Sequence, residues 1–436
     1  MKRFAFLAVL IFSIFVTNAQ SSVPAPGQAI KGLVYITGAT IHTATGQVIE
    51  NGTLAFENGK ITLIENGNVE PPKDAIIYQA DGQHIYPGFI SCNSILGLVE
   101  INAVRPTRDY REVGSFKPHV RSIIAYNTDS RVTPTVRSNG VLMAQIIPAG
   151  GRIPGSATTV QLDAWNWEDA TIKSGADKQI MLNLPSYITK SGWWAEPGGI
   201  KPNEKYSKQI DEIKDFFKQA KAYCDKNEGE TNLKFQAMCG LFDGTKSLQI
   251  DANHVKEIET AISFCNEFGL NMILTGGRDA WLLTKELKAN NIKVILDPTH
   301  ELPYRKDDDI DMPFKMPKML MDDGIEVSMT SGNFYGDQRN LPFVAAKAVA
   351  YGLTKDEALQ MITINPAKAL GVDKEYGSLE VGKSATFIVS KGDALDILGN
   401  HIELAFIDGR PVNLDNKQKQ LYRKFMNKYD KPTKQH

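Results

Sequence analysis

Residues 248–298 have the sequence LQIDANHVKEIETAISFCNEFGLNMILTGGRDAWLLTKELKANNIKVILDP, and the order of the patterns in this stretch decides the fold. Three short apolar segments, LQIDA, NMILTG and KVILDP, alternate with two stretches whose apolar residues recur at helical spacing. Strands separated by helices pair in parallel, and the helices pack outside the sheet. The stretch therefore predicts an α/β fold with a parallel sheet.

The same alternation extends in both directions. The apolar segments GVLMAQIIP, ATTVQLD and QIMLNLP precede the stretch, an amphipathic segment QIDEIKDFFKQAKAYCDK lies between, and EVSMTSG follows. About eight strands in roughly 280 residues match the dimensions of a (β/α)8 barrel. We predict a TIM barrel over residues 87–373.

Both flanks of the predicted barrel have a β pattern. Residues 32–86 contain short alternating segments separated by two Asn-Gly turns, which are typical of hairpins. Near the C-terminus, GSLEVGKSATFIVSKG and IELAFIDGRPV restore this pattern. We predict that residues 20–86 and 374–412 combine into one small composite β-sandwich domain.

The last segment, residues 413–436, is predicted to be a basic helix or tail. Lys and Arg residues dominate it, and Leu421 and Phe425 stand at helical spacing. We expect a solvated amphipathic helix, with a site for an anionic partner as the alternative.

Charge and composition limit the classes of function. The 436 residues carry 49 Lys plus Arg and 50 Asp plus Glu, which gives a net charge of -1. Such a balance is untypical of proteins dedicated to nucleic acids or anionic membranes, and it favours small-molecule chemistry. No nucleic-acid partner is expected.

The first 19 residues are typical of a signal peptide. Lys2 and Arg3 precede an apolar run from Phe4 to Val16, and the residues up to Ala19 fit a cleavage site. The run is shorter than the roughly 20 residues of a membrane-spanning helix. We expect an exported protein, periplasmic or extracellular, with cleavage near Ala19 and no membrane span.

Four cysteines occur in the chain, namely Cys92, Cys224, Cys239 and Cys265. Their spacing fits no zinc pattern, although export would allow them to oxidise. Cys265 lies in a predicted amphipathic helix and is expected in the core. Pairing of Cys224 with Cys239 is left open.

Several motifs resemble one known family. These are PGFI at residues 87–90, TINPAKALG at 363–371, GSLEVGK at 377–383 and DGR at 408–410. They are similar to motifs of the amidohydrolase superfamily, and most similar to its imidazolonepropionase-like branch. The resemblance implies a metal-dependent hydrolase of carbon-nitrogen bonds, such as cyclic amides or dipeptides. It also implies a barrel with a composite β-sandwich.

The family's metal ligands are replaced wherever the resemblance places them. The family has a His-x-His after the first strand, a His after the fifth, a His after the sixth and an Asp after the eighth. The residues at these five positions are Asn93, Ile95, Asp251, Gly276 and Ser331. No cofactor is therefore expected, unless Asp251, Asp297 and His300 rebuild a site for a divalent metal such as zinc.

Eight residues are candidates for a pocket at the barrel mouth: Cys92, Asn253, His254, Arg278, Asp297, His300, Trp193 and Trp194. Cys92 is either a nucleophile or a core residue. His254 either faces the mouth or starts the next helix. The two Trp residues either stack on a ligand or seal the rim of the barrel. The segment GGRIPGS at 150–156 lacks the ending of a phosphate-binding P-loop and resembles a family loop over the mouth.

Two functions remain open on these grounds. One is a secreted amidohydrolase with an altered site. The other is a catalytically silent relative whose barrel binds a small-molecule or peptide-like ligand. Such a relative is also suited to form a homo-oligomer, or a hetero-oligomer with an active amidohydrolase. Replacement of five ligands within a retained scaffold favours the silent relative.

Overall fold

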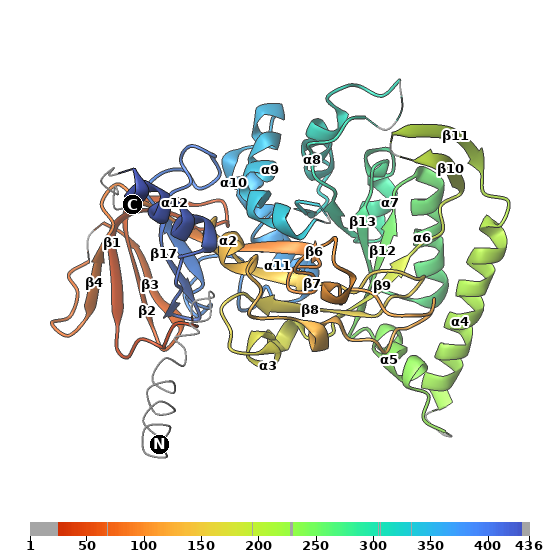
Figure 1. Cartoon of the computed structure of the whole chain (residues 1–436), viewed down its shortest axis with the longest axis horizontal. Helices are drawn as coiled ribbons and strands as arrows, with labels where there is room; N and C mark the ends of the chain where they lie inside the picture. Colours follow the sequence, from red (N-terminus) through yellow and green to blue (C-terminus); the bar gives the residue numbers. More distant parts are fainter. Residues whose placement is uncertain are drawn as a thin grey trace, which may run out of the picture.

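The computed structural model describes residues 25–67, 69–193, 195–226, 230–303, 305, 307–332 and 334–429. Two eight-stranded sheets lie side by side, and helices surround the sheet drawn on the right of Figure 1. The predicted signal peptide falls outside the described residues.

The first sheet contains the strands of the predicted barrel. Its order is β15-β14-β13-β12-β9-β8-β7-β6, and β15 and β6, at the two ends of this order, lie close to each other. The sheet is therefore nearly closed, and the predicted barrel is confirmed. Its strands are β6 (Phe89–Ser94), β7 (Val141–Ile146), β8 (Ser156–Gln161), β9 (Gln179–Asn183), β12 (Ser247–Ala252), β13 (Met272–Gly276), β14 (Lys293–Leu296) and β15 (Val327–Met329).

One strand departs from the expected parallel pairing. β8 runs antiparallel to both β7 and β9, whereas the neighbouring pairs from β9 to β15 are parallel. The connection between β7 and β8, residues 147–155, contains no helix. A parallel crossover needs about a dozen residues or more, so this short connection reverses the chain instead.

Helices cover the outside of the barrel because each has one apolar face. Helix α6 (Val255–Phe268) buries Ile258, Ala261 and Phe264, which recur at helical spacing. Cys265 of the same helix is buried, as predicted. No helix within the described ranges is long and apolar enough to cross a membrane. The other principal helices are α4 (Tyr206–Lys226), α5 (Leu233–Phe242), α7 (Thr284–Ala289), α8 (Met312–Asp322), α9 (Leu341–Lys347), α10 (Lys355–Gln360) and α11 (Ile364–Leu370).

The second sheet joins strands from both ends of the chain. Its order is β18-β17-β16-β5-β1-β2-β3, and β4 pairs with β1 in addition. The N-terminal strands, red in Figure 1, lie beside the C-terminal strands, blue in Figure 1. Its strands are β1 (Val34–His42), β2 (Val48–Glu57), β3 (Lys60–Asn66), β4 (Ile76–Gln79), β5 (His84–Pro87), β16 (Phe387–Ser390), β17 (Ile402–Ile407) and β18 (Arg410–Pro411).

A buried carboxylate connects this sheet to the barrel. Asp163 lies just after β8, is fully buried, and pairs with the buried guanidinium of Arg137. Its second oxygen accepts a hydrogen bond from the backbone N–H of Gly27 at 2.9 Å. Arg410 of the DGR motif donates to the backbone carbonyls of Gly27 and Asp163. Residues from three distant parts of the sequence thus meet at one ion cluster.

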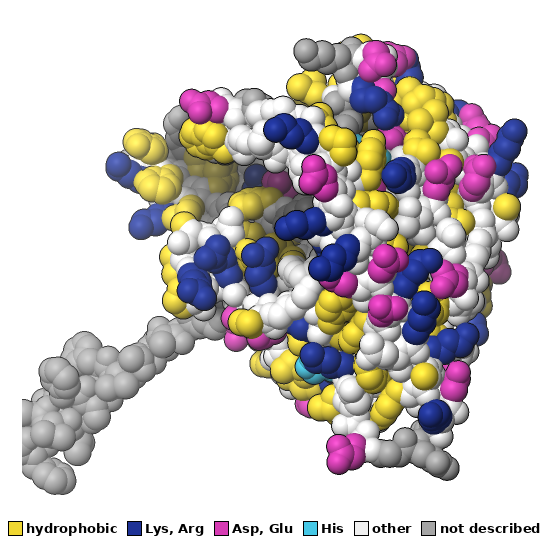
Figure 2. Space-filling view, turned by 90° about the vertical axis from the view of Figure 1, so that its right-hand side faces the viewer, with side chains coloured by type: hydrophobic (Ala, Val, Ile, Leu, Met, Phe, Trp, Pro, Cys, Tyr) yellow, Lys and Arg dark blue, Asp and Glu magenta, His cyan; other side chains and the backbone are white. Residues whose placement is uncertain are grey.

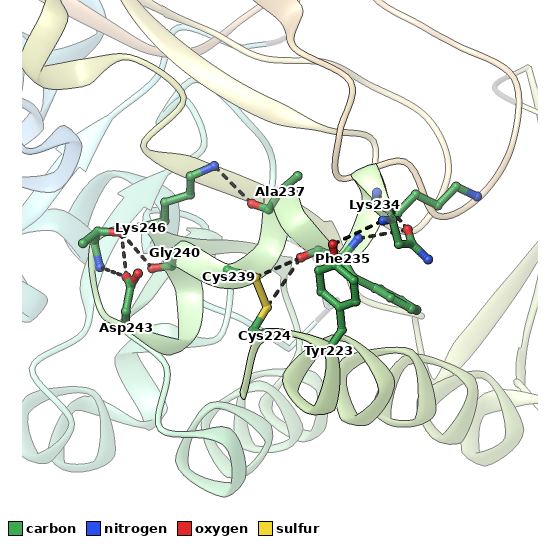
Figure 3. Close-up of a disulfide and its surroundings, with 11 residues drawn as sticks. Tyr223, Cys224, Lys234, Phe235, Ala237, Cys239, Gly240, Asp243 and Lys246 are labelled. Carbon is green, nitrogen blue, oxygen red and sulfur yellow. Dashed lines mark hydrogen bonds between the residues drawn. A yellow bond between two sulfur atoms is a disulfide. The ribbon is translucent and has the colours of Figure 1, made fainter. Parts of the chain in front are cut away.

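The two cysteines whose pairing the sequence left open form a disulfide. Cys224, near the end of α4, bonds to Cys239 in α5, with a sequence separation of 15 (Figure 3). Asn232 caps α5 by accepting from the N–H groups of Lys234 and Phe235. The disulfide therefore links two consecutive helices on the outside of the barrel.

The basic C-terminal segment contains a helix, α12 (Lys417–Lys428). Asn416 caps it by accepting a hydrogen bond from the N–H of Lys419 at 2.9 Å. Leu421 and Phe425 are 38% and 50% exposed, so the apolar stripe of this helix faces outward. Elsewhere on the molecule, Lys and Arg side chains alternate with Asp and Glu side chains over the face shown in Figure 2.

Candidate functional site

The carboxyl ends of the barrel strands surround a cavity of about 410 Å³, which we call the mouth pocket. Residues at the ends of β6, β9, β12 and β13 contribute to its wall. Active sites of such barrels lie at this end. Its lining residues are Asn93, Ile95, Asn102, Tyr110, Ile147, Pro148, Ala149, Gly150, Met181, Asn183, Asp251, Thr275, Phe334 and Tyr335.

A network of buried glutamines fills the barrel interior. Nε2 of Gln145 in β7 donates to Oε1 of Gln249 in β12 at 2.7 Å and to Oε1 of Gln179 in β9 at 3.2 Å. Oε1 of Gln145 accepts the backbone N–H of Asn93 at 3.0 Å. All three glutamines are buried. Neutral amides therefore link three strands of the barrel interior and support Asn93 at the wall of the pocket.

The five residues predicted to stand at family ligand positions lie at or next to this end of the barrel, and none of them is a histidine. Asn93, Ile95 and Asp251 line the mouth pocket, and Gly276 follows the lining residue Thr275. Ser331 is buried, and its hydroxyl has no hydrogen-bond partner within the described chain. An alkyl group, a hydroxyl and an amide cannot replace imidazoles as zinc ligands.

The backbone at Gly276 opposes a histidine at that position. Its φ angle of +87° lies in a region that side-chain-bearing residues rarely adopt. A Cβ atom added there would also lie 2.6 Å from Oδ1 of Asn253. Asn253 therefore occupies the space that a side chain at position 276 would need.

Among the described residues, Asp251 is the one charged side chain in the wall of the mouth pocket. Desolvation by the surrounding protein raises its pKa to about 6, and the nearby charges of Asp297 and Glu257 act in the same direction. Its Oδ1 accepts a hydrogen bond from Nδ2 of Asn253 at 3.2 Å, which opposes that rise. Asp251 therefore changes protonation state close to neutral pH.

Asp297 and His300 do not form a metal site with Asp251. Arg278 lies between the two acids Asp297 and Glu301, with nitrogen-oxygen distances of 4.0 Å and 3.1 Å respectively. His300 is exposed and packs edge-on against Phe314. No group of three His, Cys, Asp or Glu side chains able to hold a metal occurs within the ranges that the structure describes. Arg278 and Asp297 line a smaller cavity of about 40 Å³ instead.

His254 starts helix α6. It is buried, and its Nδ1 lies 3.6 Å from Oδ2 of Asp279. Burial raises the pKa of Asp279, but hydrogen bonds from His254, Arg305 and the N–H of Val255 outweigh burial and hold this pKa below its ordinary value. The carboxylate of Glu257 accepts the backbone N–H groups of both Asn253 and His254. This cluster fixes the loop that follows β12.

The remaining candidates lie outside the mouth pocket. Cys92 is fully buried in β6, and burial raises its pKa to about 12, so its thiol is not prepared for nucleophilic attack. Trp193 belongs to an outer hairpin of β10 (Ile188–Trp193) and β11 (Glu196–Pro202), where it is 57% exposed. Its Nε1 donates to Glu196 at 3.4 Å. Trp194 lies outside the described residues.

The structure adds pocket residues that sequence reasoning missed. Tyr110, Asn183, Phe334 and Tyr335 line the mouth, and the rings of the last two lie 4.5 Å apart between centroids. The glutamine network was missed as well. Its signal in the sequence is a Gln within each of three otherwise apolar strands, where an uncompensated amide would be costly.

Comparisons with known proteins agree with this architecture. Residues 249–419 match the profile of the Amidohydrolase family. The imidazolonepropionase of Thermoplasma volcanium is 24% identical over 83% of this chain and 90% of its own length. These matches support the amidohydrolase superfamily as the family of this chain. Within it, the chain is similar to the imidazolonepropionase-like branch.

Two further amidohydrolases are similar to this chain. A crystal structure of an amidohydrolase from Thermotoga maritima superposes with a TM-score of 0.76 at 22% identity, over 87% of this chain and 99% of that one. Amidohydrolase tasK of Hapsidospora irregularis is 22% identical over 82% of this chain. The chain spans 39% of the length of that protein.

The amidohydrolase motifs have structural roles here. Asp408 of the DGR motif accepts hydrogen bonds from Tyr376 at 3.0 Å and Ser384 at 2.6 Å, and Asn365 donates to the carbonyl of Val327 at 2.9 Å. These contacts hold the second sheet and the last barrel strand in place. The scaffold of a typically metal-dependent family is thus kept, whereas the residues at its ligand positions do not fit a divalent metal.

Proposed function

We propose that this amidohydrolase-family protein binds a small polar organic molecule in the mouth pocket and does not carry out metal-dependent hydrolysis. The observation that carries the proposal is the set of residues at the carboxyl ends of the barrel strands. A cavity of about 410 Å³ is kept there, while Asn93, Ile95, Asp251, Gly276 and Ser331 occupy the ligand positions. A volume of this size suits a small-molecule ligand.

The chemistry of the wall supports a polar ligand that contains amide groups. Asn93 and Asn183 offer amide donors and acceptors, and Asp251 offers a carboxylate. Oγ1 of Thr275 is buried without a protein partner within the described chain, and a buried polar atom normally makes a hydrogen bond. Tyr110, Phe334 and Tyr335 add aromatic surface for the apolar part of such a ligand.

Hydrolysis through an altered site is the second candidate, and one observation favours it. The pKa of Asp251 is raised to about 6, which suits a general base near neutral pH. Asp251 would then accept a proton from a water that attacks an amide carbon, and the departing amine would take that proton. Asp251 would have to carry out both proton transfers alone, because the described lining residues include no second carboxyl group and no imidazole, so we rank this candidate below ligand binding.

The two candidates separate in one set of measurements on the mature protein. Elemental analysis for zinc, manganese and iron comes first, followed by thermal shift and hydrolysis assays with N-acyl amino acids, dipeptides and cyclic amides. Binding without turnover and without stoichiometric metal is expected. One tightly held metal ion per chain would contradict the proposal. Turnover that is lost in Asp251→Asn and survives chelation would establish the second candidate.

We also propose that the protein is exported. The pattern of the first 19 residues and the Cys224–Cys239 disulfide support this, since disulfides persist mainly in oxidising compartments. Expression of the full chain, followed by cell fractionation and N-terminal sequencing, tests the proposal. A mature protein outside the cytosol that begins near Gln20 is expected. Uncleaved protein in the cytosol with reduced Cys224 would overturn it.

A further inference from the structure

A second cavity, of about 800 Å³, lies next to the mouth pocket, and we call it the side pocket. Tyr110 and Pro148 line both cavities. Most of the side pocket is formed by one irregular segment, residues 109–125. Lys234 of α5, which is distant in sequence, also lines it. Its charged lining residues are Asp109, Arg111, Glu112, Lys117, Arg121 and Lys234.

The charges of the two cavities differ in sign. Within the part of the chain that the structure describes, four Lys or Arg and two acids line the side pocket, whereas Asp251 is the one charged residue of the mouth pocket. Cations therefore predominate in the side pocket. Arg121 is partly neutralised, because its Nε lies 2.6 Å from Asp177. Arg111 and Lys234 are exposed to solvent. These two cations are accessible to a ligand.

The loop of Gly150 and Gly151 follows the shared lining residue Pro148, and residues of both cavities hold it. Nζ of Lys117, from the side pocket, donates to the carbonyl of Gly150 at 3.1 Å. Nδ2 of Asn183, from the mouth pocket, donates to the carbonyl of Gly151 at 2.8 Å. The loop is therefore fixed between the two cavities.

The Arg111 side chain packs against Gly150. A Cβ atom on Gly150 would lie 2.7 Å from Nε of Arg111 and 3.0 Å from its Cγ, so the missing side chain of glycine leaves room for the arginine. Gly150 itself lines the mouth pocket. The Arg111 side chain, which lines the side pocket, thus contacts a residue of the mouth pocket along its length from Cγ to Nε.

The segment that carries the cations is attached to the barrel along its length. The N–H of Ala149 donates to Tyr110 at 2.7 Å, and the N–H groups of Arg152 and Ile153 donate to Ser115 at 2.8 Å and 2.9 Å. The N–H of Lys117 donates in return to Ile153 at 2.8 Å. These bonds hold the segment in place beside the mouth before any ligand binds.

We propose that the side pocket is a second subsite, in which Arg111 and Lys234 bind the carboxylate of a peptide-like ligand whose amide portion occupies the mouth pocket. The inference rests on the proposed function, because it extends the ligand that the mouth pocket binds. Two cations next to a pocket that offers amides and one carboxylate select a ligand with an anionic end. Charge-assisted hydrogen bonds to such an end are stronger than neutral ones.

A panel of dipeptides, each compared with its own C-terminal amide, tests the inference on the mature protein by isothermal titration calorimetry. We expect the acids to bind about tenfold more tightly than the amides. Arg111→Gln and Lys234→Gln should each reduce this preference, and Arg111→Lys should keep part of it. Arg108→Gln, an exposed arginine of the preceding turn that lines neither cavity, is the matched control.

The possible outcomes separate the inference from the proposed function. Equal binding of acids and amides would overturn the carboxylate subsite while leaving ligand binding in the mouth pocket intact. A preference for acids that persists in both Arg111→Gln and Lys234→Gln would also overturn it. Failure of every acid and every amide to bind would count against the proposed function itself.

Discussion

Nε2 of Gln145 donates a hydrogen bond over 2.7 Å to Oε1 of Gln249, and both side chains are fully buried inside the barrel. Replacement of Gln145 by Leu would leave Oε1 of Gln249 and the N–H of Asn93 without this partner. A buried polar group left unpaired costs about 1–3 kcal/mol. We expect Gln145→Leu to lower the free energy of unfolding by that amount, as measured by urea denaturation. Gln47→Leu, at an exposed position, is the control and should have little effect.

The pKa of Asp251 predicts a pH dependence of stability. Because its folded-state pKa of about 6 exceeds the ordinary value of 3.8, the folded protein binds a proton more tightly than the unfolded chain. Its contribution to stability is fully present below pH 3.8 and is lost as the pH rises through 6. Asp251→Asn should therefore raise the melting temperature at pH 7 and have little effect near pH 4. Equal effects at both pH values would contradict the raised pKa.

The contact between Gly276 and Asn253 predicts unequal costs for two glycine substitutions. Both Gly276→Ala and Gly269→Ala place a Cβ at a positive φ, which costs about 1–2 kcal/mol. Only Gly276→Ala also meets a neighbour, at 2.6 Å from Asn253, since nothing lies within 4 Å at Gly269. Gly276→Ala should therefore lower the urea midpoint further. Asn253→Ala in the same chain should recover the difference, and no recovery would exclude the contact as its cause.

The Cys224–Cys239 disulfide predicts a measurable loss on removal. Closing a loop of 15 residues stabilises a folded protein by about 3 kcal/mol in the chain-entropy description. The double variant Cys224→Ser/Cys239→Ser should lose about that much stability in urea denaturation. Dithiothreitol should destabilise the unmodified protein and leave the double variant unchanged. Equal sensitivity of the two proteins to dithiothreitol would show that the bond does not form.

Removal of the Asp163 carboxylate should lower the stability of the protein more than removal of the disulfide. The carboxylate is fully buried and pairs with Arg137, so Asp163→Ala would leave a buried guanidinium uncompensated. Removal of one partner of a buried ion pair costs about 3–5 kcal/mol. Asp163→Ala should lose that much stability, whereas Asp415→Ala, which removes the partly buried partner of the exposed Arg423, should lose under about 1 kcal/mol. Similar losses for the two variants would exclude Asp163 as the main link between sheet and barrel.

The fold was predictable because its signals are local and periodic. Residues 248–298 alternate strand and helix patterns, and the GSLEVGK and DGR motifs mark the returning β segments. The antiparallel direction of β8 was not predicted, since ATTVQLD has the same apolar pattern in either direction. The lack of a helical pattern in residues 147–155 was the sequence feature that could have predicted the antiparallel direction.

The site was predictable only in part, for a physical reason. The replacement of histidines by Asn93 and Ile95 is a prediction from the motif alignment, and the structure shows that both residues line the mouth pocket. The side pocket depends on residues 109–125, which have no periodicity that predicts where Arg111 lies. Likewise, the sequence left the role of Trp193 open, and the structure places it in a hairpin with β11, outside the lining of the mouth pocket.

The sheet made from both ends of the chain has a consequence for the timing of folding. β5 obtains its neighbour β16 only after about 390 residues have been synthesised, because that strand ends at Ser390. Contacts between such distant segments form slowly, since the intervening chain must first be brought together. Until β16 to β18 emerge, the early strands expose an unpaired edge. A ribosome-bound or translocating chain therefore remains open to chaperones for nearly its whole synthesis.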